Sequence, residues 1–168
     1  MNKQILVELI SEAKRIEEDA IYSAKSQFEA SSWWKNVNLW IGIPTAIMSA
    51  IAGFSALSEY SYILAGVLAI LATALTALST FLNPNQKSNT HLNAGNNYLA
   101  LRNRARIYKN VDCKVEKDIE ILAQGLHQLA NERDNLNKNS PQVSREHFEA
   151  ARRGIKEGEA SYKVDTKS

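Results

Sequence analysis

The side chains best suited to chemistry in this sequence are scattered rather than grouped. His91 has no second histidine or cysteine at ligand spacing in its own segment, so we expect a hydrogen-bonded histidine and no metal site. Cys113 is the only cysteine, which excludes a disulfide framework and indicates an unreactive thiol. Arg152, Arg153 and Lys156 form a small basic cluster. An ordinary solvated face explains this cluster, and contact with anionic lipid or a ligand phosphate is the alternative.

Larger catalytic constellations are missing from the sequence. There is no phosphate-binding glycine loop and no nucleophile with a matching base and oxyanion site. The isoelectric point near 8.6 is too mild to indicate nucleic-acid binding. We therefore predict a protein that is not an enzyme, needs no cofactor or metal and binds no nucleic acid.

The elements that must position these residues are organised around an apolar stretch, Asn36–Gln86, whose only charged residue is Glu59. It contains two apolar runs, residues 39–57 and 62–82. Each run has about 20 residues, which as a helix spans about 30 Å, the thickness of the hydrocarbon core of a bilayer. The alternative is a buried hairpin of a soluble domain, but such helices are usually shorter and keep a polar face. We predict two transmembrane helices joined by a short connector.

The distribution of charge predicts the orientation of these helices. Residues 1–38 hold five Lys or Arg, and residues 83–168 hold fifteen, whereas the connector holds none. Basic residues near a span resist translocation, so we expect both termini in the cytoplasm and the connector on the outer side. Aromatic residues at the span ends are typical of membrane interfaces. We assign Trp33, Trp34 and Trp40 to the inner interface, and Tyr60 and Tyr62 to the outer one.

Both spans carry a stripe of small or hydroxyl-bearing side chains. The first stripe comprises Gly42, Ala46, Ser49, Gly53 and Ala56. The second comprises Ala65, Ala69 and Ala72, followed by Thr73, Thr76 and Thr80. One interpretation is helix packing, with each threonine bonded to a carbonyl one turn earlier. The other is a pore lined by weakly polar side chains, which requires a homo-oligomer because two helices cannot enclose a conduit. Without a charge at mid-membrane, a proton relay is disfavoured and ion selectivity should be weak.

The flanking segments are predicted to be helical. Residues 1–38 form an amphipathic helix, and a helix stop at residues 83–85 precedes a polar turn and a helix from about Thr90 to Asn110. A helix over residues 115–136 has a nearly heptad-spaced apolar seam, suited to packing within the chain or between copies. The last helix covers residues 144–159, and residues 161–168 form a tail. The seam comprises Val115, Ile119, Leu122, Leu126 and Leu129.

The predicted fold class is an all-α membrane protein. A two-transmembrane helical hairpin carries long cytoplasmic N- and C-terminal helices that form a helical bundle. We treat residues 1–160 as one domain, comprising the cytoplasmic helix 1–38, the spans 39–57 and 62–82, the cytoplasmic helices 89–138 and the C-terminal helix 144–160.

This order of elements resembles the SLATT family, small bacterial two-span proteins associated with SMODS nucleotidyltransferases and SLOG sensors. The resemblance covers about residues 10–135. It rests on a long N-terminal helix that enters the first span, a very short outer turn, and a second span that ends in Phe81-Leu82-Asn83-Pro84. The next helix then carries Lys87, His91, Tyr98, Leu101 and Arg102.

The resemblance implies an effector of bacterial conflict systems that forms a pore or disrupts the inner membrane once a nucleotide signal is sensed. His91, Tyr98, Leu101 and Arg102 would be signature positions. Their implied role is to hold the cytoplasmic helix against the bases of the spans. The chain has no recognisable nucleotide-binding domain, so a separate sensor protein or a pocket between protomers would receive the signal.

Three hypotheses follow. The first is a homo-oligomeric, pore-forming antiphage effector, opened by a nucleotide second messenger or a partner. The second is a membrane-anchored helical scaffold without channel activity. The third, a small transporter or enzyme subunit, is the weakest, because the spans hold no ionisable group and the chain holds no catalytic set.

Overall fold

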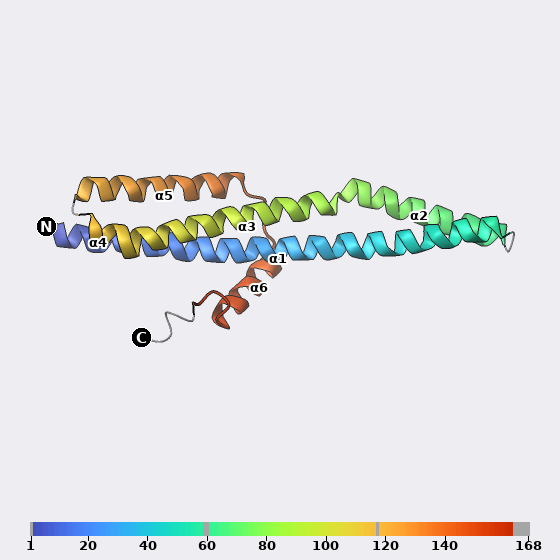
Figure 1. The fold of residues 1–168 in the computed structure, drawn as a ribbon, viewed down its shortest axis with the longest axis horizontal. Coiled ribbons are helices and arrows are strands. Elements are labelled where there is room, and N and C mark those ends of the chain that lie inside the picture. The colour runs from blue at the N-terminus through green and yellow to red at the C-terminus, as the bar shows by residue number, and fades with distance from the viewer. Residues whose placement is uncertain (1, 59–60, 117, 163–168) are drawn as a thin grey trace. The chain divides into compact units, whose positions relative to one another are not determined.

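A computed structural model of the 168-residue chain describes residues 2–58, 61–116 and 118–162 (Figure 1). These residues form helices joined by short connections, and no strand occurs among them. The predicted all-α fold is therefore confirmed for the described part of the chain. The elements are α1 (Asn2–Leu57), α2 (Tyr62–Leu82), α3 (Pro84–Ile107), the π-helical turn η1 (Tyr108–Asp112), α4 (Cys113–Val115), α5 (Ile119–Asn139) and α6 (Arg145–Lys156).

The chain divides into two compact units. One, here called the polar unit, is formed by Met1–Ala30 together with Thr90–Ser168. The other, the hairpin unit, is Ser31–Asn89 and contains the two apolar runs. The division falls inside α1 and α3, so both units share continuous helices.

The N-terminal helix and the first apolar run are one uninterrupted helix, α1. No glycine or proline occurs between Ala30 and Trp40, so nothing in the local sequence stops the helix at the unit boundary. Pro44 lies inside α1 and cannot donate the usual amide bond to residue 40. Next to it, the Thr45 hydroxyl donates to the Ile41 carbonyl at 2.7 Å. The helix nevertheless continues to Leu57.

The second apolar run folds as α2 over the range predicted from its composition. Ser61 caps its start by accepting a hydrogen bond from the amide of Leu64. Asn83 ends it in the left-handed conformation, with φ of 46°, and its amide donates to the Ser79 carbonyl at 2.9 Å. Asparagine tolerates this conformation better than most residues because its short polar side chain bonds locally.

The predicted polar turn after residue 85, and the helix start near Thr90, are wrong. A single residue, Asn83, separates α2 from α3, which begins at Pro84. Proline favours the first position of a helix, because its fixed φ is helical and its missing amide has no partner there anyway. The helix stop expected from the Asn-Pro-Asn sequence is therefore also a helix start.

The predicted helix over residues 115–136 also needs correction. Val115 ends the short helix α4 and is 76% exposed, so it is not in the same helix as the other seam residues. α5 begins at Ile119, where the carboxylate of Asp118 accepts a hydrogen bond from the amide of Glu120 at 2.8 Å. An aspartate at this position accepts a hydrogen bond from an otherwise unpaired amide of the first turn. The start of α5 is therefore set by this cap and not by the spacing of the apolar residues.

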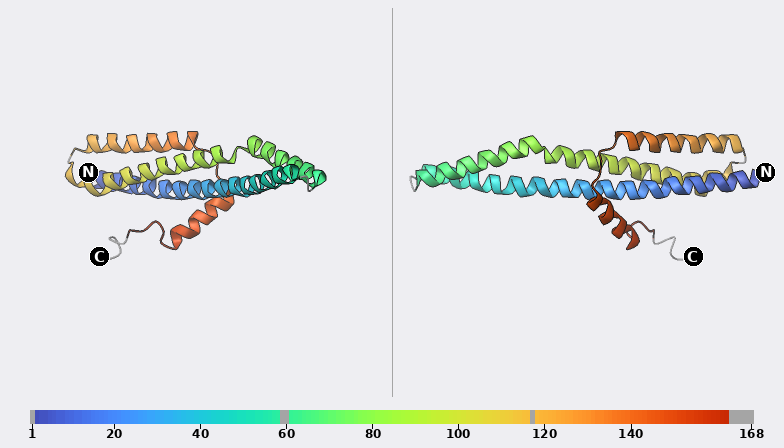
Figure 2. Two further views of the ribbon diagram at one scale, coloured as in Figure 1. Left: turned by 45° about the vertical axis from the view of Figure 1, so that its right-hand side comes forward. Right: turned by 180° about the vertical axis from the view of Figure 1, so that it is seen from behind.

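The core of the polar unit lies between α1, α3 and α5. Figures 1 and 2 show α5 running alongside α3. Leu101 of α3 is fully buried, and Ile16 of α1 is nearly so. From α5, Leu122 and Leu129 enter the same cluster, with Ile119, Leu126 and Leu136 packed against it. The other buried members are Leu9, Ala13, Ala20, Ala105, Tyr108 and Cys113.

The last helix, α6, begins at Arg145, one residue after the predicted start. Ser144 is at its N-cap, but the Ser144 side chain makes no capping hydrogen bond. It ends at Lys156 and not at Glu159. Ser161 and Tyr162, placed in the tail by the sequence, belong to the described chain, whereas residues 163–168 lie outside the described residues.

Candidate functional site

The apolar faces of α1 and α2 are exposed. Two helical stretches, Lys3–Leu57 and Tyr62–Val115, each contain an 18-residue window apolar enough to cross a membrane, with mean hydropathies of 1.6 and 2.1. Only 11% of each window is buried inside the chain. Large side chains such as Ile63 (82% exposed) and Phe81 (88% exposed) face outward. Burial inside a soluble fold, the alternative interpretation of the sequence, does not describe these helices.

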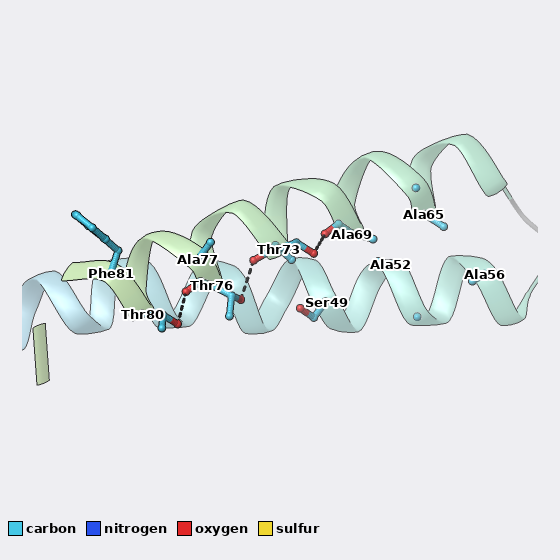
Figure 3. Close-up of a pocket in the computed structure, with 13 residues that line it drawn as sticks. Ser49, Ala52, Ala56, Ala65, Ala69, Thr73, Thr76, Ala77, Thr80 and Phe81 are labelled. Carbon is cyan, nitrogen blue, oxygen red and sulfur yellow. Dashed lines mark hydrogen bonds between the residues drawn. The ribbon is translucent and has the colours of Figure 1, made fainter. Parts of the chain in front are cut away.

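A groove of about 1050 Å³ runs between α1 and α2 in the hairpin unit (Figure 3). Its walls are small or hydroxyl-bearing, apart from Phe81 at one end. Gly42 and Ala46 are not among its lining residues, but it brings together the other residues predicted from the stripes, namely Ser49, Gly53, Ala56, Ala65, Ala69, Ala72, Thr73, Thr76 and Thr80. Besides Phe81, the remaining lining residues are Ala52, Gly66 and Ala77.

The three threonines of the groove all bond within their own helix. The hydroxyls of Thr73, Thr76 and Thr80 donate to the carbonyl oxygens of the residues four positions earlier, at 2.8, 2.8 and 2.9 Å. Figure 3 shows Thr76 and Thr80 pointing toward α1. This is the back-bonding expected from the sequence. A hydroxyl that donates in this way keeps lone pairs that can accept a hydrogen bond from a groove occupant.

The glycines of the spans are not packed against the rest of the chain. Among the described residues, a methyl carbon placed on Gly42, Gly53 or Gly66 would meet no other atom within 4 Å. The buried residues of the two spans are instead Ala52 and Ser55 of α1 and Ala65 and Ala72 of α2. Close helix approach within the chain therefore does not explain these glycines.

Aromatic residues lie at the ends of the apolar segment. Trp33 and Trp34 pack edge to face with ring centroids 4.6 Å apart, and the Lys87 ammonium lies 4.2 Å from the Trp34 ring centroid. Trp40 is 80% exposed, and Tyr62 is exposed as well. These are amphipathic rings on an exposed apolar surface, the arrangement found at membrane interfaces. Tyr60 and Glu59 lie outside the described residues.

The residues singled out on α3 connect it to other parts of the polar unit. The Tyr98 hydroxyl donates to Asn137 Oδ1 of α5 at 2.9 Å, and Leu101 fills the core. Arg102 Nη2 donates to the Ala160 carbonyl beyond α6 at 2.8 Å. Nδ1 of the buried His91 lies 2.6 Å from Gln27 Oε1 of α1. These contacts join α3 to α1, to α5 and to the segment beyond α6 within the polar unit.

Burial dominates the electrostatics of the titratable groups in the polar unit. It lowers the pKa of His91 below its ordinary 6.5, and the nearby His147 lowers that pKa further. Burial also raises the pKa of the Cys113 thiol, which lies against the Tyr108 hydroxyl. That hydroxyl donates to the Leu122 carbonyl at 2.7 Å. A buried thiol with a raised pKa is a poor nucleophile.

Sequence reasoning missed two buried polar contacts. Gln27, 4% exposed, bonds His91 through Oε1 and donates from Nε2 to the Pro141 carbonyl at 2.8 Å. In the hairpin unit, the hydroxyls of Ser31 and Ser88 lie 3.2 Å apart. Gln27 follows Ala20 and Ala24 of the apolar face by seven and three positions. The sequence signal that could have revealed these contacts was a polar residue, Gln27, at a position where the helical period expects an apolar one.

Ligand sites for metals are not evident in the described chain. Within residues 2–58, 61–116 and 118–162, no group of three or more His, Cys, Asp or Glu side chains could hold a metal ion. The groove between the spans is lined by aliphatic, hydroxyl-bearing and aromatic groups. Such walls can pack against another helix or contact water, but they offer no acid, base or nucleophile of useful strength.

Comparison with known proteins agrees with this architecture. The comparisons with curated proteins and with solved structures find no match. A family model, the SMODS and SLOG-associating 2TM effector domain family 4, matches residues 11–166, which is nearly the whole chain. The two exposed apolar helices correspond to the two transmembrane segments in that description, so this is a membrane protein. The chain belongs to the SMODS and SLOG-associating 2TM effector domain family 4.

Proposed function

We propose that the protein is a pore-forming effector of a bacterial antiphage or conflict system, active as a homo-oligomer without catalysing a reaction. Its two spans lie in the inner membrane with both termini in the cytoplasm, and a nucleotide signal or a separate sensor protein opens it. The observation that carries the proposal is the groove between α1 and α2, which presents small and hydroxyl-bearing side chains without an occupant from the same chain.

The open space beside the glycines of the spans suggests that copies of the chain associate. In lipid, helices associate through small residues that let backbones approach closely. Gly53 and Gly66 line the groove, and the described part of the chain leaves the space beside them open. A helix from a second copy can use this space. Several hairpins are needed in any case, because two helices cannot surround a conduit.

The chemistry of the groove suits a weakly selective pore. Its only polar side chains are the hydroxyls of Ser49 and of the three threonines, and none of the lining residues is charged. Hydroxyl oxygens can contact water without a fixed charge that would favour cations or anions. We therefore expect leakage of small ions of either sign.

Oligomer size in detergent tests the assembly. Gly53→Leu fills the groove, whereas Ala50→Leu adds the same side chain at an exposed position of α1 that does not line it. Light scattering coupled to size exclusion should show a smaller species for Gly53→Leu and an unchanged species for Ala50→Leu. A monomeric wild-type protein, with and without added di- and oligonucleotides, would refute the assembly.

Cysteine accessibility tests the pore itself. In a Cys113→Ser background, Thr76→Cys places a thiol in the groove, and Ala74→Cys places one at an exposed position of α2 outside it. In liposomes loaded with potassium, an impermeant cationic thiol reagent should reduce triggered efflux only for Thr76→Cys. Equal effects on both variants, or liposomes that stay sealed with every nucleotide and partner tried, would contradict the proposal.

A membrane-anchored scaffold is the second candidate. It is favoured by the hydrogen bonds of Thr73, Thr76 and Thr80 within α2, because hydroxyls paired in this way can also face lipid or another helix. A scaffold would keep its cellular activity when residues 39–57 and 62–82 are replaced by unrelated spans. A pore-forming effector would lose it.

A further inference from the structure

The chain beyond α6 folds back on the polar unit as a short segment, here called the C-terminal strap (Gly158–Tyr162). Gly158 has a φ of 93°, in the left-handed region that favours glycine. The amide of Glu159 returns to the Gly154 carbonyl at 3.0 Å, and the amide of Ser161 donates to the Gly158 carbonyl at 3.0 Å. The Ser161 hydroxyl donates to the same Gly158 carbonyl at 2.6 Å, so backbone bonds and one side chain together shape the strap.

A second glycine makes room for the strap. A methyl carbon on Gly154 would lie 2.6 Å from Glu159 Oε2 and 2.8 Å from its Cδ, so only glycine lets this carboxylate lie so close to α6. In the sequence, Gly154 and Gly158 show a small-xxx-small spacing that matches no membrane motif. The structure accounts for it, since one residue permits the turn and the other permits the approach of the carboxylate.

The strap is held by basic residues of α1 and α3. The Lys25 ammonium bonds Glu159 Oε2 at 2.7 Å, and Arg102 donates to the carbonyl of the next residue. The guanidinium carbons of Arg102 and Arg106 lie 5.2 and 4.5 Å from the Tyr162 ring centroid. In the described residues, neither guanidinium forms an ion pair with a carboxylate.

Three cations from two helices thus face one short segment, which offers them a carboxylate, a carbonyl oxygen and an aromatic ring. An anion joined to a planar ring is also the chemistry of a nucleotide. Its phosphates suit ammonium and guanidinium donors, and its base suits a guanidinium plane. The strap contacts are polar and partly exposed, with the Lys25 and Glu159 side chains 26% and 53% exposed. Ion pairs that water can reach are individually weak, so a ligand can displace these contacts.

We propose that Lys25, Arg102 and Arg106 form a nucleotide-binding site that the C-terminal strap occupies as a built-in substitute ligand. Binding requires the strap to leave, which releases its link between α1 and α3. The proposal concerns ligand binding by the polar unit and does not require the hairpins to form a pore.

Titration of the full chain in detergent micelles tests the proposal, with ATP, pyrophosphate and adenosine as probes. The double variant Glu159→Gln/Tyr162→Leu weakens the strap and should bind ATP about tenfold more tightly than the wild type, since an exposed ion pair and a cation–π contact no longer compete. ATP should bind more tightly than pyrophosphate, and adenosine most weakly. In the double variant, Arg106→Gln should abolish most ATP binding, whereas Arg153→Gln, a change at an exposed arginine of α6, should not.

Hydrogen exchange of the wild-type chain provides a second measurement. Saturating ATP should increase exchange at the amides of Glu159 and Ser161, which are hydrogen-bonded in the strap. Equal ATP affinity in the wild type and the double variant would overturn the proposal. Absence of ATP binding to both, or a strap that stays protected while ATP is bound, would overturn it as well. If pyrophosphate bound as tightly as ATP, the site would be an anion site only, and the proposed nucleotide specificity would be wrong.

Discussion

Gly95→Ala should destabilise the polar unit, against the usual preference of helices for alanine. Gly95 lies inside α3, where replacing glycine by alanine at an exposed position would stabilise a helix by about 1 kcal/mol. Here the new methyl carbon would lie 2.5, 2.7 and 3.1 Å from three ring carbons of Phe28. Favourable carbon–carbon contacts lie at about 3.5–4.0 Å, so the ring or α1 must move by roughly 1 Å.

The size of the effect follows from these opposing terms. Overpacking a filled site costs about 1–3 kcal/mol, and the contact with three ring atoms places this site in the upper part of that range. After the gain in helix propensity, the net loss is about 1–2 kcal/mol. For a chain of this size it lowers Tm by about 2–8 °C. Thermal unfolding in detergent, followed by circular dichroism, measures it.

A double-mutant cycle identifies the cause. Phe28→Leu removes the ring atoms that the new methyl group meets, so Gly95→Ala in that background should be neutral or stabilising by up to about 1 kcal/mol. If Gly95→Ala raised Tm in the wild-type background, or lowered it equally in both backgrounds, the packing argument would be refuted.

Three further predictions concern the same unit. Leu101→Ala removes a fully buried side chain and should lower the free energy of unfolding by about 2–5 kcal/mol. Leu92→Ala, at a 42% exposed position of the same helix, should lower it by less than about 0.5 kcal/mol when both variants are compared by thermal unfolding. Because the pKa of His91 is lowered in the folded chain, its protonation favours unfolding; Tm should therefore fall as the pH decreases below 6.5, and His91→Gln should flatten that dependence. Tyr98→Phe removes the hydrogen bond to α5 and should cost about 0.5–1.5 kcal/mol, and an unchanged Tm would show that this bond contributes nothing.

Several elements could be predicted because their causes are local. The range of α2, residues 62–82, follows from an uninterrupted apolar composition. The start of α6 was predicted to within one residue, although the Ser144 side chain makes no capping hydrogen bond there. The expected junctions near residues 85 and 115 were wrong because alternative caps act there. Asn83 with Pro84 turns a helix stop into a one-residue junction, and Asp118 moves the start of α5 past Val115. Such caps depend on single side chains, so a prediction based on the spacing of apolar residues cannot place them.

The candidate site was predictable only in part. The hydroxyl spacing in the second span predicted the back-bonding of the threonines, and the structure shows it at Thr73, Thr76 and Thr80. The stripe of the first span predicted Ser49 and Gly53 at the groove, but it also included Gly42 and Ala46, which do not line it. A stripe defines one face of a helix, and the second helix decides which part of that face it meets.

The sequence alone determined the helical fold and the two apolar spans, because helix period, capping residues and transfer of apolar side chains from water act over at most 20 or so neighbouring residues. It also placed His91, Tyr98 and Arg102 on one helix. Only the tertiary structure decided what they bind, namely Gln27, Asn137 and Ala160, which lie 64, 39 and 58 positions away. The contacts of the C-terminal strap are likewise decided by the tertiary structure. Its ion pair joins Lys25 and Glu159, which lie 134 positions apart, and no local pattern encodes such a contact.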